Sequence, residues 1–359
     1  MSRRHPFLEL FFARLREFRR EPEVIFWVFG FPIVLAIGLG IAFRDKAPDE
    51  IAVGVIDVPV VAGAGGASVA IGNPSADDLV RALPKSDNFD ARKMTSDEAA
   101  QALRLGKIAL AVTPGAEYDY RFDPTRPDSL LARARVHDAL ERARGRVDPV
   151  KASETLVTEP GARYIDFLIP GLLGMNIMGG GMWGVGFVIV DMRSRKLLKR
   201  LVATPMRKSH FLAAMLASRM LLVFGEMLLL LFFGWLVFGL VMKGALWQVT
   251  LMTLLGAFAF AGLGLLVASR AQKIETVSGL INLVMVPMFV FSGIFFSSER
   301  FPGVIQPFVK ALPLTVLNDG LRAVILEGAS LSSQLLRIGV LLVWGVGTFA
   351  VAMRAFRWT

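Results

Sequence analysis

The sequence contains no cysteine and only three histidines among its 359 residues. The absence of cysteine excludes disulfide scaffolds, thiolate zinc sites, iron–sulfur clusters and cysteine nucleophiles. The histidines (His5, His137 and His210) are too few and too scattered to form a catalytic triad or an imidazole metal site. We therefore predict no catalytic, cofactor-binding or metal-ligating residue in this chain.

Charged residues are also scarce. They make up 19% of the chain, hydrophobic residues make up 54%, and the mean hydropathy is +0.55. Soluble domains average about 25% charged residues, so an ordinary soluble protein is a poor fit. Disordered segments contain a much smaller fraction of apolar residues, so disorder is excluded for most of the chain. The net charge of +10 fits either nucleic acid or an anionic membrane surface, so the distribution of the charges must decide between them.

Long apolar runs dominate the sequence. A span of the bilayer takes about 20 apolar residues at roughly 1.5 Å each. Six runs meet this length, at residues 24–43, 167–190, 211–242, 244–269, 276–298 and 331–353. Because they are apolar on all sides, they are typical of membrane spans rather than of half-buried soluble helices. We predict an α-helical polytopic membrane protein with six transmembrane helices, the last five within residues 167–353.

Lysine and arginine concentrate in alternate connections between these runs. The N-terminal 23 residues carry six arginines, residues 191–210 carry seven basic residues, and residues 270–273 and the tail at 354–359 carry two each. The positive-inside rule places these segments and both termini in the cytoplasm. The first run is too long for a typical signal-peptide core, so we interpret it as an uncleaved span. The basic charge is then explained without nucleic acid.

A polar insert at residues 44–166 separates the first two runs and is predicted to be extracytoplasmic. Its acidic and basic residues nearly balance, and its pattern favours a small α/β domain. Strands are expected at 51–56 and 108–112 and helices at 77–83, 96–105 and 129–144. Ser96 is the expected N-cap of the second helix, and residues 62–68 form a Gly/Ala-rich loop.

The chain carries no energy source of its own. A phosphate-binding loop needs Gly-x4-Gly-Lys followed by Ser or Thr. The only Gly-Lys pair is Gly106-Lys107, which precedes Ile108 and lies in the insert. We therefore predict that the chain is not an enzyme, and that any active transport depends on a partner or an ion gradient.

Two segments on the predicted cytoplasmic side are amphipathic. In the first, Phe7, Phe11, Leu15 and Phe18 share one face, which predicts an in-plane helix that ends at Glu21-Pro22. Two roles are possible for this helix: it anchors the chain to the membrane, or it transmits movement from a cytoplasmic partner.

The second amphipathic segment covers residues 193–205. Leu197, Leu198, Leu201 and Val202 form a stripe, the basic residues Arg193, Lys196, Lys199 and Arg200 point away from it, and Thr204-Pro205 ends the helix. A helix of this kind can dock its leucine stripe into a groove of a partner, which is our prediction. The alternative is a basic loop that only fixes topology.

Few polar groups lie inside the runs. Glu226 is the only acid well within one, and intramembrane carboxylates often mark sites. With Asn176 and Asn282 it forms our set of candidate pathway residues. The alternative for Glu226 is a structural pairing with Arg219, two turns away, or simple protonation. Five glycines of the second run predict close helix approach: Gly179, Gly180, Gly181, Gly184 and Gly186.

Several motifs together resemble ABC-2 type transporter permeases. Residues 193–205 are similar to a cytoplasmic loop of that family that ends in Leu-x-Ala-Thr-Pro. Further matches, in the family's order, are Arg20-Glu21-Pro22, residues 51–57, residues 106–114, residues 291–296, Phe301-Pro302, residues 312–315 and Leu321-Arg322. Where members commonly carry Gly-Thr-Leu-Glu, this chain has Lys196-Leu197-Leu198-Lys199.

The resemblance implies a dimer, with a second copy or a paralogue, of six-span permeases docked to a cytoplasmic ATP-binding cassette ATPase. ATP and magnesium belong to that ATPase, and this chain resembles the form with a large extracytoplasmic domain between the first two spans. The implied ATPase-coupling residues are Arg193, Lys196, Leu198, Lys199, Leu201, Thr204 and Pro205. The implied outer gate lies around residues 297–330, with Phe295, Phe296, Pro302, Pro313 and Arg322. Its prolines break it into pieces too short to span, which independently fits a re-entrant region.

These features predict the permease subunit of an exporter in a bacterial plasma (inner) membrane. Its substrate is expected to be amphiphilic or lipid-like, with drugs, lipids and polymer conjugates equally compatible, and an extracytoplasmic adaptor is an optional further partner. The alternative is a non-transporting membrane scaffold or receptor whose insert binds a partner. An intramembrane hydrolase is not favoured, because the runs hold no plausible nucleophile–base pair.

Overall fold

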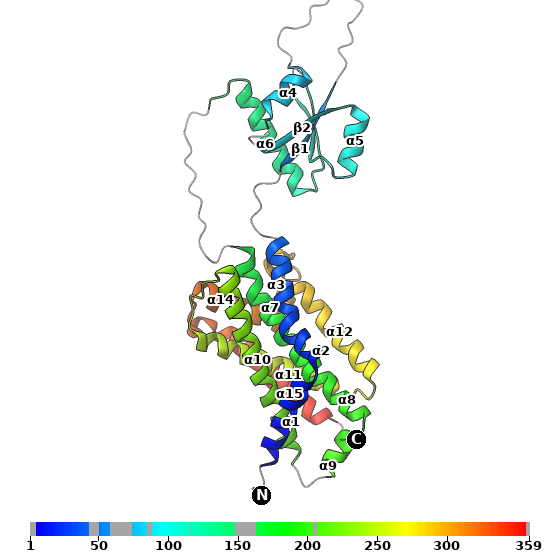
Figure 1. The fold of residues 1–359 in the computed structure, drawn as a ribbon, viewed down its shortest axis with the longest axis vertical. Helices are drawn as coiled ribbons and strands as arrows, with labels where there is room; N and C mark the ends of the chain where they lie inside the picture. Colours follow the sequence, from blue (N-terminus) through cyan, green and yellow to red (C-terminus); the bar gives the residue numbers. More distant parts are fainter. Residues whose placement is uncertain are drawn as a thin grey trace, which may run out of the picture. The chain divides into compact units, whose positions relative to one another are not determined.

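The computed structural model describes residues 5–42, 50–57, 74–84, 88–115, 117–147, 163–203 and 207–356. These residues divide into two compact units. The helical unit comprises the described residues before 44 and after 157, and the insert domain comprises those between (Figure 1). The predicted loop at 62–68 and the residues Thr204 and Pro205 lie outside the described residues.

The described part of the helical unit contains six helices long and apolar enough to cross a membrane. They cover Pro22–Ala42, Tyr164–Ser194, Ser209–Phe238, Leu246–Ala268, Ile274–Phe291 and Leu331–Ala355. By length and composition, the six-span prediction is confirmed. The fifth helix ends at Phe291 rather than at Ser298, because Gly293 adopts a left-handed φ of 69° that turns the chain. Phe295 and Phe296 consequently lie in the turn after this helix.

The N-terminal part of the helical unit consists of four consecutive helical segments: α1 (Pro6–Arg20), α2 (Pro22–Ile25), η1 (Phe26–Gly30) and α3 (Phe31–Ala42). The predicted break at Glu21-Pro22 is present, since Pro22 has no N–H to continue α1 and instead begins α2. The segment η1 is a π-helix, a wider turn that is frequent at functional positions.

The second span consists of α7 (Tyr164–Gly181), η3 (Met182–Phe187) and α8 (Val188–Ser194). It packs closely on α11 (Leu246–Ala268) at small residues. A Cβ on Gly186 would lie only 2.8 Å from the carbonyl oxygen of Gly264, and one on Gly181 would meet the backbone of Phe260. The glycines therefore bring these two backbones together, the arrangement that small residues permit in membranes.

Eight further helical segments of this unit are described. They are α9 (Leu197–Val202), α10 (Lys208–Phe238), α12 (Ile274–Phe291), η4 (Ser298–Arg300), α13 (Gln306–Ala311), α14 (Pro313–Glu327), η5 (Leu331–Gln334) and α15 (Leu335–Ala355). Helix α14 is buried along most of its length and packs on α7, α11 and α15. The outer faces of α10, α12 and α15 expose large apolar side chains such as Trp235, Leu283 and Leu336, which suits contact with lipid.

The insert domain is a four-stranded sheet with helices on both faces. Its strands β1 (Ile51–Ile56), β2 (Phe89–Met94), β3 (Leu110–Thr113) and β4 (Asp119–Arg121) lie in the order β2-β1-β3-β4. The first three are parallel and β4 is antiparallel to β3. Helices α4 (Ala76–Ala82) and α6 (Pro127–Ala143) share one apolar core with the sheet, and α5 (Ser96–Arg104) shares a second, smaller core.

Two expectations about the insert need correction. The N-cap of α5 is Thr95, not Ser96, because the Thr95 hydroxyl accepts from the Glu98 N–H (3.3 Å) and the Glu98 carboxylate accepts from the Thr95 N–H (2.8 Å). Strands β2 and β4 were not expected. They flank the sheet, and their exposed polar residues, among them Arg92 and Arg121, hide the apolar alternation that predicts a strand.

Candidate functional sites

The first candidate site is an ion pair inside the apolar part of α10. The Arg219 guanidinium contacts the Glu226 carboxylate, with Nη1 to Oε1 at 2.9 Å and Nη2 to Oε2 at 3.2 Å. Both side chains are buried, at 8% and 1% exposure. Because the two residues are seven positions apart, they lie two helical turns apart on one face of α10, and the arginine reaches along the helix to its partner.

A notch in α7 accommodates this arginine. A Cβ on Gly180 would overlap the Arg219 guanidinium, and one on Gly184 would lie 3.5 Å from the Arg219 Cδ. The sequence predicted a packing role for these glycines in general, but it gave no signal that Gly180 makes room for a charged side chain. Gly180 is therefore part of the ion-pair site.

A small cavity lies beside the carboxylate. It has a volume of about 10 Å³ and is lined by Val28, Phe29, Pro32, Ile33, Asn176, Glu226, Leu229 and Leu230. A cavity of this size holds about one water molecule. The amide of Asn176 donates to the Val28 carbonyl in η1 (2.8 Å). Two of the three predicted pathway residues, Asn176 and Glu226, thus meet at one polar site between the first span, α7 and α10.

The third predicted pathway residue lies elsewhere. Asn282 is an exposed residue of α12 and does not line the cavity. Its neighbours Leu280 and Leu283 are also exposed. The structure therefore does not bring Asn282 together with Glu226.

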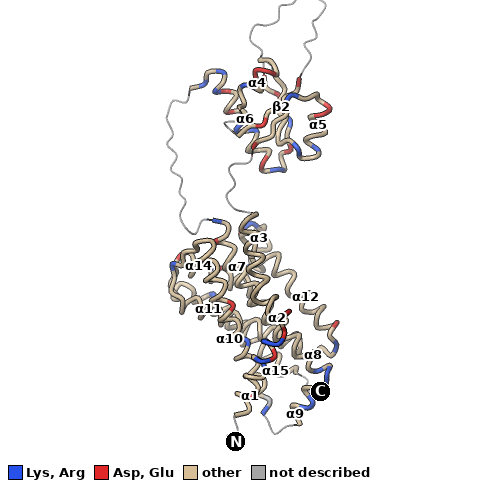
Figure 2. The backbone as a smooth tube through the Cα atoms, viewed as in Figure 1, with Lys and Arg blue, Asp and Glu red and all other residues tan. Residues whose placement is uncertain are grey.

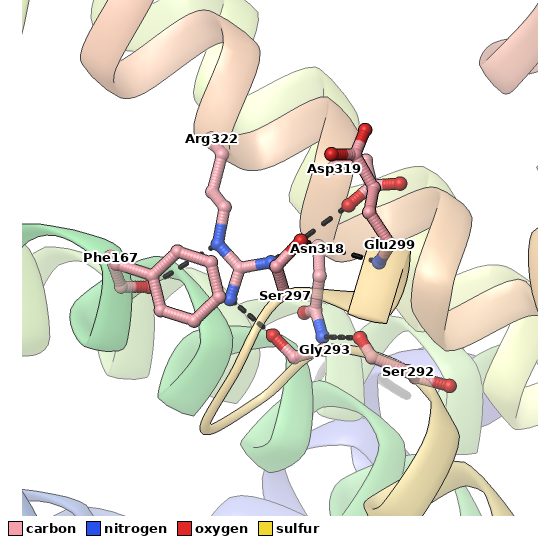
Figure 3. Close-up of polar contacts among 8 residues, drawn as sticks. All are labelled: Phe167, Ser292, Gly293, Ser297, Glu299, Asn318, Asp319 and Arg322. Carbon is pink, nitrogen blue, oxygen red and sulfur yellow. Dashed lines mark hydrogen bonds and ion pairs between the residues drawn. The ribbon is translucent and has the colours of Figure 1, made fainter. Parts of the chain in front are cut away.

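The second candidate site fastens α14 to the rest of the unit. The Arg322 guanidinium donates to the carbonyls of Phe167 (3.3 Å) and Gly293 and lies 3.6 Å from the centre of the Phe167 ring (Figure 3). Gly171 of α7 makes room for the turn after α12 and for Arg322, because a Cβ there would lie 2.6 Å from the Ile294 carbonyl oxygen and 3.0 Å from Arg322 Nη2. Arg322 thereby joins α14 to the start of α7 and to the turn after α12.

Two neighbours of Arg322 on α14 extend this attachment. The Asn318 amide donates to the Ser292 carbonyl (2.9 Å), and Asp319 lies 3.8 Å from Arg322 Nη1 (Figure 3). Burial raises the pKa of Asp319 above its usual range, although Arg322 opposes this shift. Burial also lowers the pKa of Arg322 to about 10. No pattern in the sequence identifies the partners of Asn318 and Arg322, because they are backbone carbonyls of distant segments.

The other predicted gate residues surround this attachment. Pro313 is the first residue of α14, and Pro302 lies between η4 and α13. The centre of the Phe301 ring lies 5.0 Å from that of the Phe291 ring and 5.8 Å from that of the Phe296 ring. Phe295 packs against the main apolar core. Residues 298–327 therefore form three short helices held by Arg322, Asn318 and an aromatic cluster.

The third candidate site is the connection after α8. We predicted one amphipathic helix over residues 193–205, and this is wrong. Helix α8 ends at Ser194, Lys196 adopts a left-handed φ of 58°, and α9 begins at Leu197. A left-handed residue reverses the local direction of the chain, so it separates the two helices. Thr204 and Pro205 lie outside the described residues, and no end of the helix is assigned to them.

Arg193 was predicted to lie on the basic side of one helix, opposite the leucine stripe, but it belongs to α8 and not to α9. It is buried (8% exposed), and its guanidinium donates to the carbonyls of Ala268 (2.7 Å), Ser269 (3.4 Å) and Ala271. These carbonyls belong to Ala268, the last residue of α11, and to residues that follow it, where helix carbonyls lack partners and favour a positive charge. The sequence could not reveal this role, because it depends on where α11 ends in space.

Leu198 also differs from its prediction. We expected the leucine stripe to face a partner, but Leu198 is 1% exposed and belongs to the main core of the helical unit. Leu201 is half-buried against that core, whereas Lys196, Lys199 and Arg200 are exposed. The reason is that a short amphipathic helix buries its apolar stripe on the nearest apolar surface, here its own chain.

This burial gives a testable prediction. Leu198→Ala is expected to destabilise the helical unit by about 2–5 kcal/mol, because it removes a fully buried side chain. Lys199→Ala on the exposed side of the same helix is the control and should leave stability unchanged. Thermal unfolding of the purified protein in detergent measures both. Equal melting temperatures for wild type and Leu198→Ala would contradict the placement of Leu198.

Helix α1 lies beside this connection. The Arg14 guanidinium contacts Met192 Sδ (3.0 Å), and the His5 ring lies 4.9 Å from that of His210 at the start of α10. Arg193 also faces the Phe356 ring at the end of α15 (5.2 Å). Parts of α1, α8, α9, α10 and α15 therefore meet at one end of the helical unit, where basic residues gather around α8 and α9 (Figures 1 and 2).

The six apolar helices, with polar connections at their ends, define a multi-pass membrane protein. A family model described as "ABC-2 family transporter protein" matches residues 22–354. The chain therefore belongs to the ABC-2 family of transporter proteins, and the resemblance seen in its motifs is confirmed.

Two curated proteins are similar to parts of this chain. "ABC transporter G family member 20" of Dictyostelium discoideum is 25% identical over 221 residues, which are 60% of this chain and 30% of that protein. "Linearmycin resistance permease protein LnrN" of Bacillus subtilis (strain 168) is 23% identical over 186 residues, which are 49% of this chain and 46% of that protein. The matched parts thus span less than half the length of either relative.

Proposed function

We propose that this chain is the transmembrane permease subunit of an ATP-binding cassette exporter. ATP is bound with magnesium and hydrolysed by a separate cytoplasmic subunit, and the chain works as a dimer with a second copy or a paralogue. The observation that carries the proposal is the meeting of α1, α8, α9 and the end of α15 at one end of a unit whose sequence matches an ABC-2 family model. At such a junction, movement of a docked ATPase reaches α8 of the second span and α15 of the last span directly.

The substrate we propose is amphiphilic or lipid-like. The polar site of Arg219, Glu226 and Asn176 lies among apolar side chains of the first span, α7 and α10. A molecule with a polar head and an apolar body matches both parts of this environment. One relative is named a resistance permease, which supports outward transport from the cytoplasm or inner leaflet as the direction for this chain.

ATP-dependent export tests the proposal. The chain is co-expressed with candidate ATP-binding cassette subunits, and uptake of fluorescent lipids and amphiphilic dyes is measured in inverted membrane vesicles. We expect uptake only with ATP and only with a hydrolysis-competent ATPase. A variant of the ATPase that lacks its phosphate-binding lysine is the control. ATP-independent uptake, or no recovery of any ATPase with the chain, would contradict the proposal.

The proposed orientation places both termini in the cytoplasm of a bacterial inner membrane and the insert outside, where an adaptor has access to it. A tag inserted at residues 62–68 is expected to be accessible from outside intact cells, whereas one at Ser209 is expected to be accessible only after permeabilisation. The physical reason is the asymmetry of Lys and Arg beside the spans. Labelling of both tags on the same face would overturn the six-span orientation.

A further inference from the structure

We propose that the exported amphiphile has an acidic head, and that this head replaces Glu226 on the Arg219 guanidinium. The head is a carboxylate, a phosphate or a sulfonate. The apolar body of the same molecule lies on the exposed face of α7 and η3 that covers the arginine. The inference rests on the proposed function and adds the charge of the substrate and the groups that receive it.

One hydrogen-bond donor of Arg219 is unused. A guanidinium has five N–H groups, and the contacts with Glu226 involve Nη1 and Nη2. The Nε atom is buried and has no hydrogen-bond partner among the residues that the structure describes. Buried polar groups are normally paired, so an unpaired donor on a charged side chain indicates a further acceptor. The fork of Nε and Nη donors fits the two oxygens of an acidic head.

Arg219 lies beneath one face of the second span. This face, called the glycine face below, consists of Gly180, Trp183, Gly184 and Phe187, whose spacing places them on one side of the helix. Trp183 and Gly184 are exposed, and Gly180 and Phe187 are half-buried. A Cβ on Gly184 would lie 3.5 Å from Arg219 Cδ and 3.7 Å from its Nε, so the stem of the arginine passes under an exposed glycine. Rotation about the bonds of that stem brings its donors to the glycine face.

The glycine face also suits an apolar chain. The centres of the Trp183 and Phe187 rings lie 5.4 Å apart. The two glycines have no side chain, so a ligand can approach the backbone closely there. An amphiphile on this face places its body against the rings and its head at the arginine. The positive charge at that end favours an acidic head over a neutral or basic one.

Glu226 balances the charge of Arg219 when no substrate is bound. If an acidic head joined them, two negative groups would share one arginine in an apolar environment, which is unfavourable. Glu226 therefore takes up one proton from water when the head binds and returns it to water when the head leaves. The cavity of about 10 Å³ beside the carboxylate holds about one water molecule, which is enough to deliver this proton.

Glu226 is the titratable group of this site. Arg219 is the charged side chain that acts on it among the described residues. The rest of the cavity lining does not titrate: Val28, Phe29, Pro32 and Ile33 from the first span, Asn176 from α7, and Leu229 and Leu230 from α10. Because proton uptake accompanies binding, the affinity for an acidic head should rise as the pH falls.

Two matched probes test the inference on the full chain in phosphatidylcholine nanodiscs. One is a pyrene-labelled alkyl sulfonate, which stays ionised at every pH used, and the other is the corresponding alcohol. Fluorescence titration, corrected for empty nanodiscs, measures their binding. The wild type should bind the sulfonate at least about tenfold more tightly than the alcohol, and more tightly at about pH 6 than at about pH 8. Equal binding of the two probes would overturn the inference.

Variants of the ion pair test the exchange. Glu226→Gln should bind the sulfonate about tenfold more tightly than the wild type at about pH 8 and without pH dependence, because the neutral amide leaves the charge of Arg219 unbalanced. Arg219→Leu/Glu226→Leu removes the arginine without stranding a carboxylate, and it should bind both probes equally. Unchanged affinity and pH dependence in Glu226→Gln would show that the head does not replace Glu226.

A variant of the glycine face tests the route to the arginine. Gly184→Leu covers the stem of Arg219 without a clash at Cβ, because the nearest atoms would lie at 3.5 Å or more. It should reduce sulfonate binding at least about tenfold. The matched control is Gly179→Leu, at a position on α7 where a Cβ meets nothing within 4 Å, and it should bind as wild type. Wild-type binding by Gly184→Leu would contradict the proposed route.

ATP-dependent transport distinguishes the substrate from other occupants of the glycine face. In inverted vesicles with the ATPase, accumulation of the sulfonate that is lost in Gly184→Leu supports the inference. If neutral dyes are exported and the sulfonate only binds, the site belongs to a resident acidic lipid. If two Trp183→Cys copies cross-link equally with and without the sulfonate, the face belongs to a second copy. Either result overturns the inference and leaves the proposed function, whereas a lack of export of every probe overturns the function itself.

Discussion

Arg219→Ala is expected to destabilise the helical unit by about 3–5 kcal/mol, because it leaves a buried carboxylate without its partner. Glu226 is 1% exposed, and the notch at Gly180 is shaped for the guanidinium, so the alanine variant also leaves a void between α7 and α10. Lower folded yield and a lower melting temperature in detergent measure the effect. A melting temperature equal to that of the wild type would contradict the pairing of Arg219 with Glu226.

The partner variant separates a structural role from a transport role. Glu226→Gln keeps one of the two oxygens that contact Arg219, so it is expected to destabilise the unit less than Arg219→Ala and to leave enough folded protein for assembly. If the polar site is part of the pathway, export or its pH dependence should change. If Glu226→Gln exports like the wild type at every pH, the ion pair of Arg219 and Glu226 has a structural role only.

A double variant gives the matched control for this pair. Arg219→Leu/Glu226→Leu removes both charges together, and replacement of a buried pair by apolar side chains is often neutral or stabilising. Its melting temperature should therefore exceed that of Arg219→Ala. Export by this variant, measured in the same vesicles, reports the pathway role without the cost of an unpaired charge.

Arg322→Ala is expected to release α14 from α7 and from the turn after α12. Without the guanidinium, the carbonyls of Phe167 and Gly293 each lose a donor, at about 1.5–3 kcal/mol for a hydrogen bond to a charged group. The native chain has no cysteine, so a single introduced cysteine reports accessibility cleanly. Thr315→Cys, at a position 1% exposed in α14, should react slowly with a maleimide alone and at least about tenfold faster when combined with Arg322→Ala.

Two controls accompany this measurement. Val304→Cys is at a position 93% exposed and should react quickly in both backgrounds. Arg322→Lys keeps the positive charge but lacks the several N–H donors of the guanidinium. It should therefore slow the labelling of Thr315→Cys only part of the way back to the rate seen with Arg322. Equal, slow labelling of Thr315→Cys with and without Arg322 would show that α14 does not depend on this arginine.

The sequence was sufficient for features that depend on local composition. The six spans follow from run length, because a helix must be about 20 apolar residues long to cross the hydrocarbon core. The break at Glu21-Pro22 follows from the missing N–H of proline. In the insert domain, β1 and β3 were predicted because they are buried and apolar, whereas β2 and β4 carry exposed polar residues and escaped detection.

The sequence was misleading where an amphipathic pattern had two surfaces to choose from. The stripe of Leu198 and Leu201 predicts an apolar contact, but the pattern does not say whether the contact is with a partner or with the same chain. Leu198 packs in the core of its own chain, and the left-handed Lys196 breaks the helix that the pattern suggested. The side chains that α9 and the preceding turn expose are instead basic, among them Lys199 and Arg200.

Only the tertiary structure decided what the buried arginines do. Arg193 meets the carbonyls at the end of α11, Arg219 fits the notch at Gly180, and Arg322 joins Phe167 to Gly293. Each charge in an apolar environment must find polar partners, and the sequence alone identifies that need. The partners are mostly backbone groups of distant segments. Every residue has such a carbonyl, so the sequence does not show which ones an arginine will meet. Their position is set by how the helices pack, so the spans were determined by the sequence and the polar contacts between them by the fold.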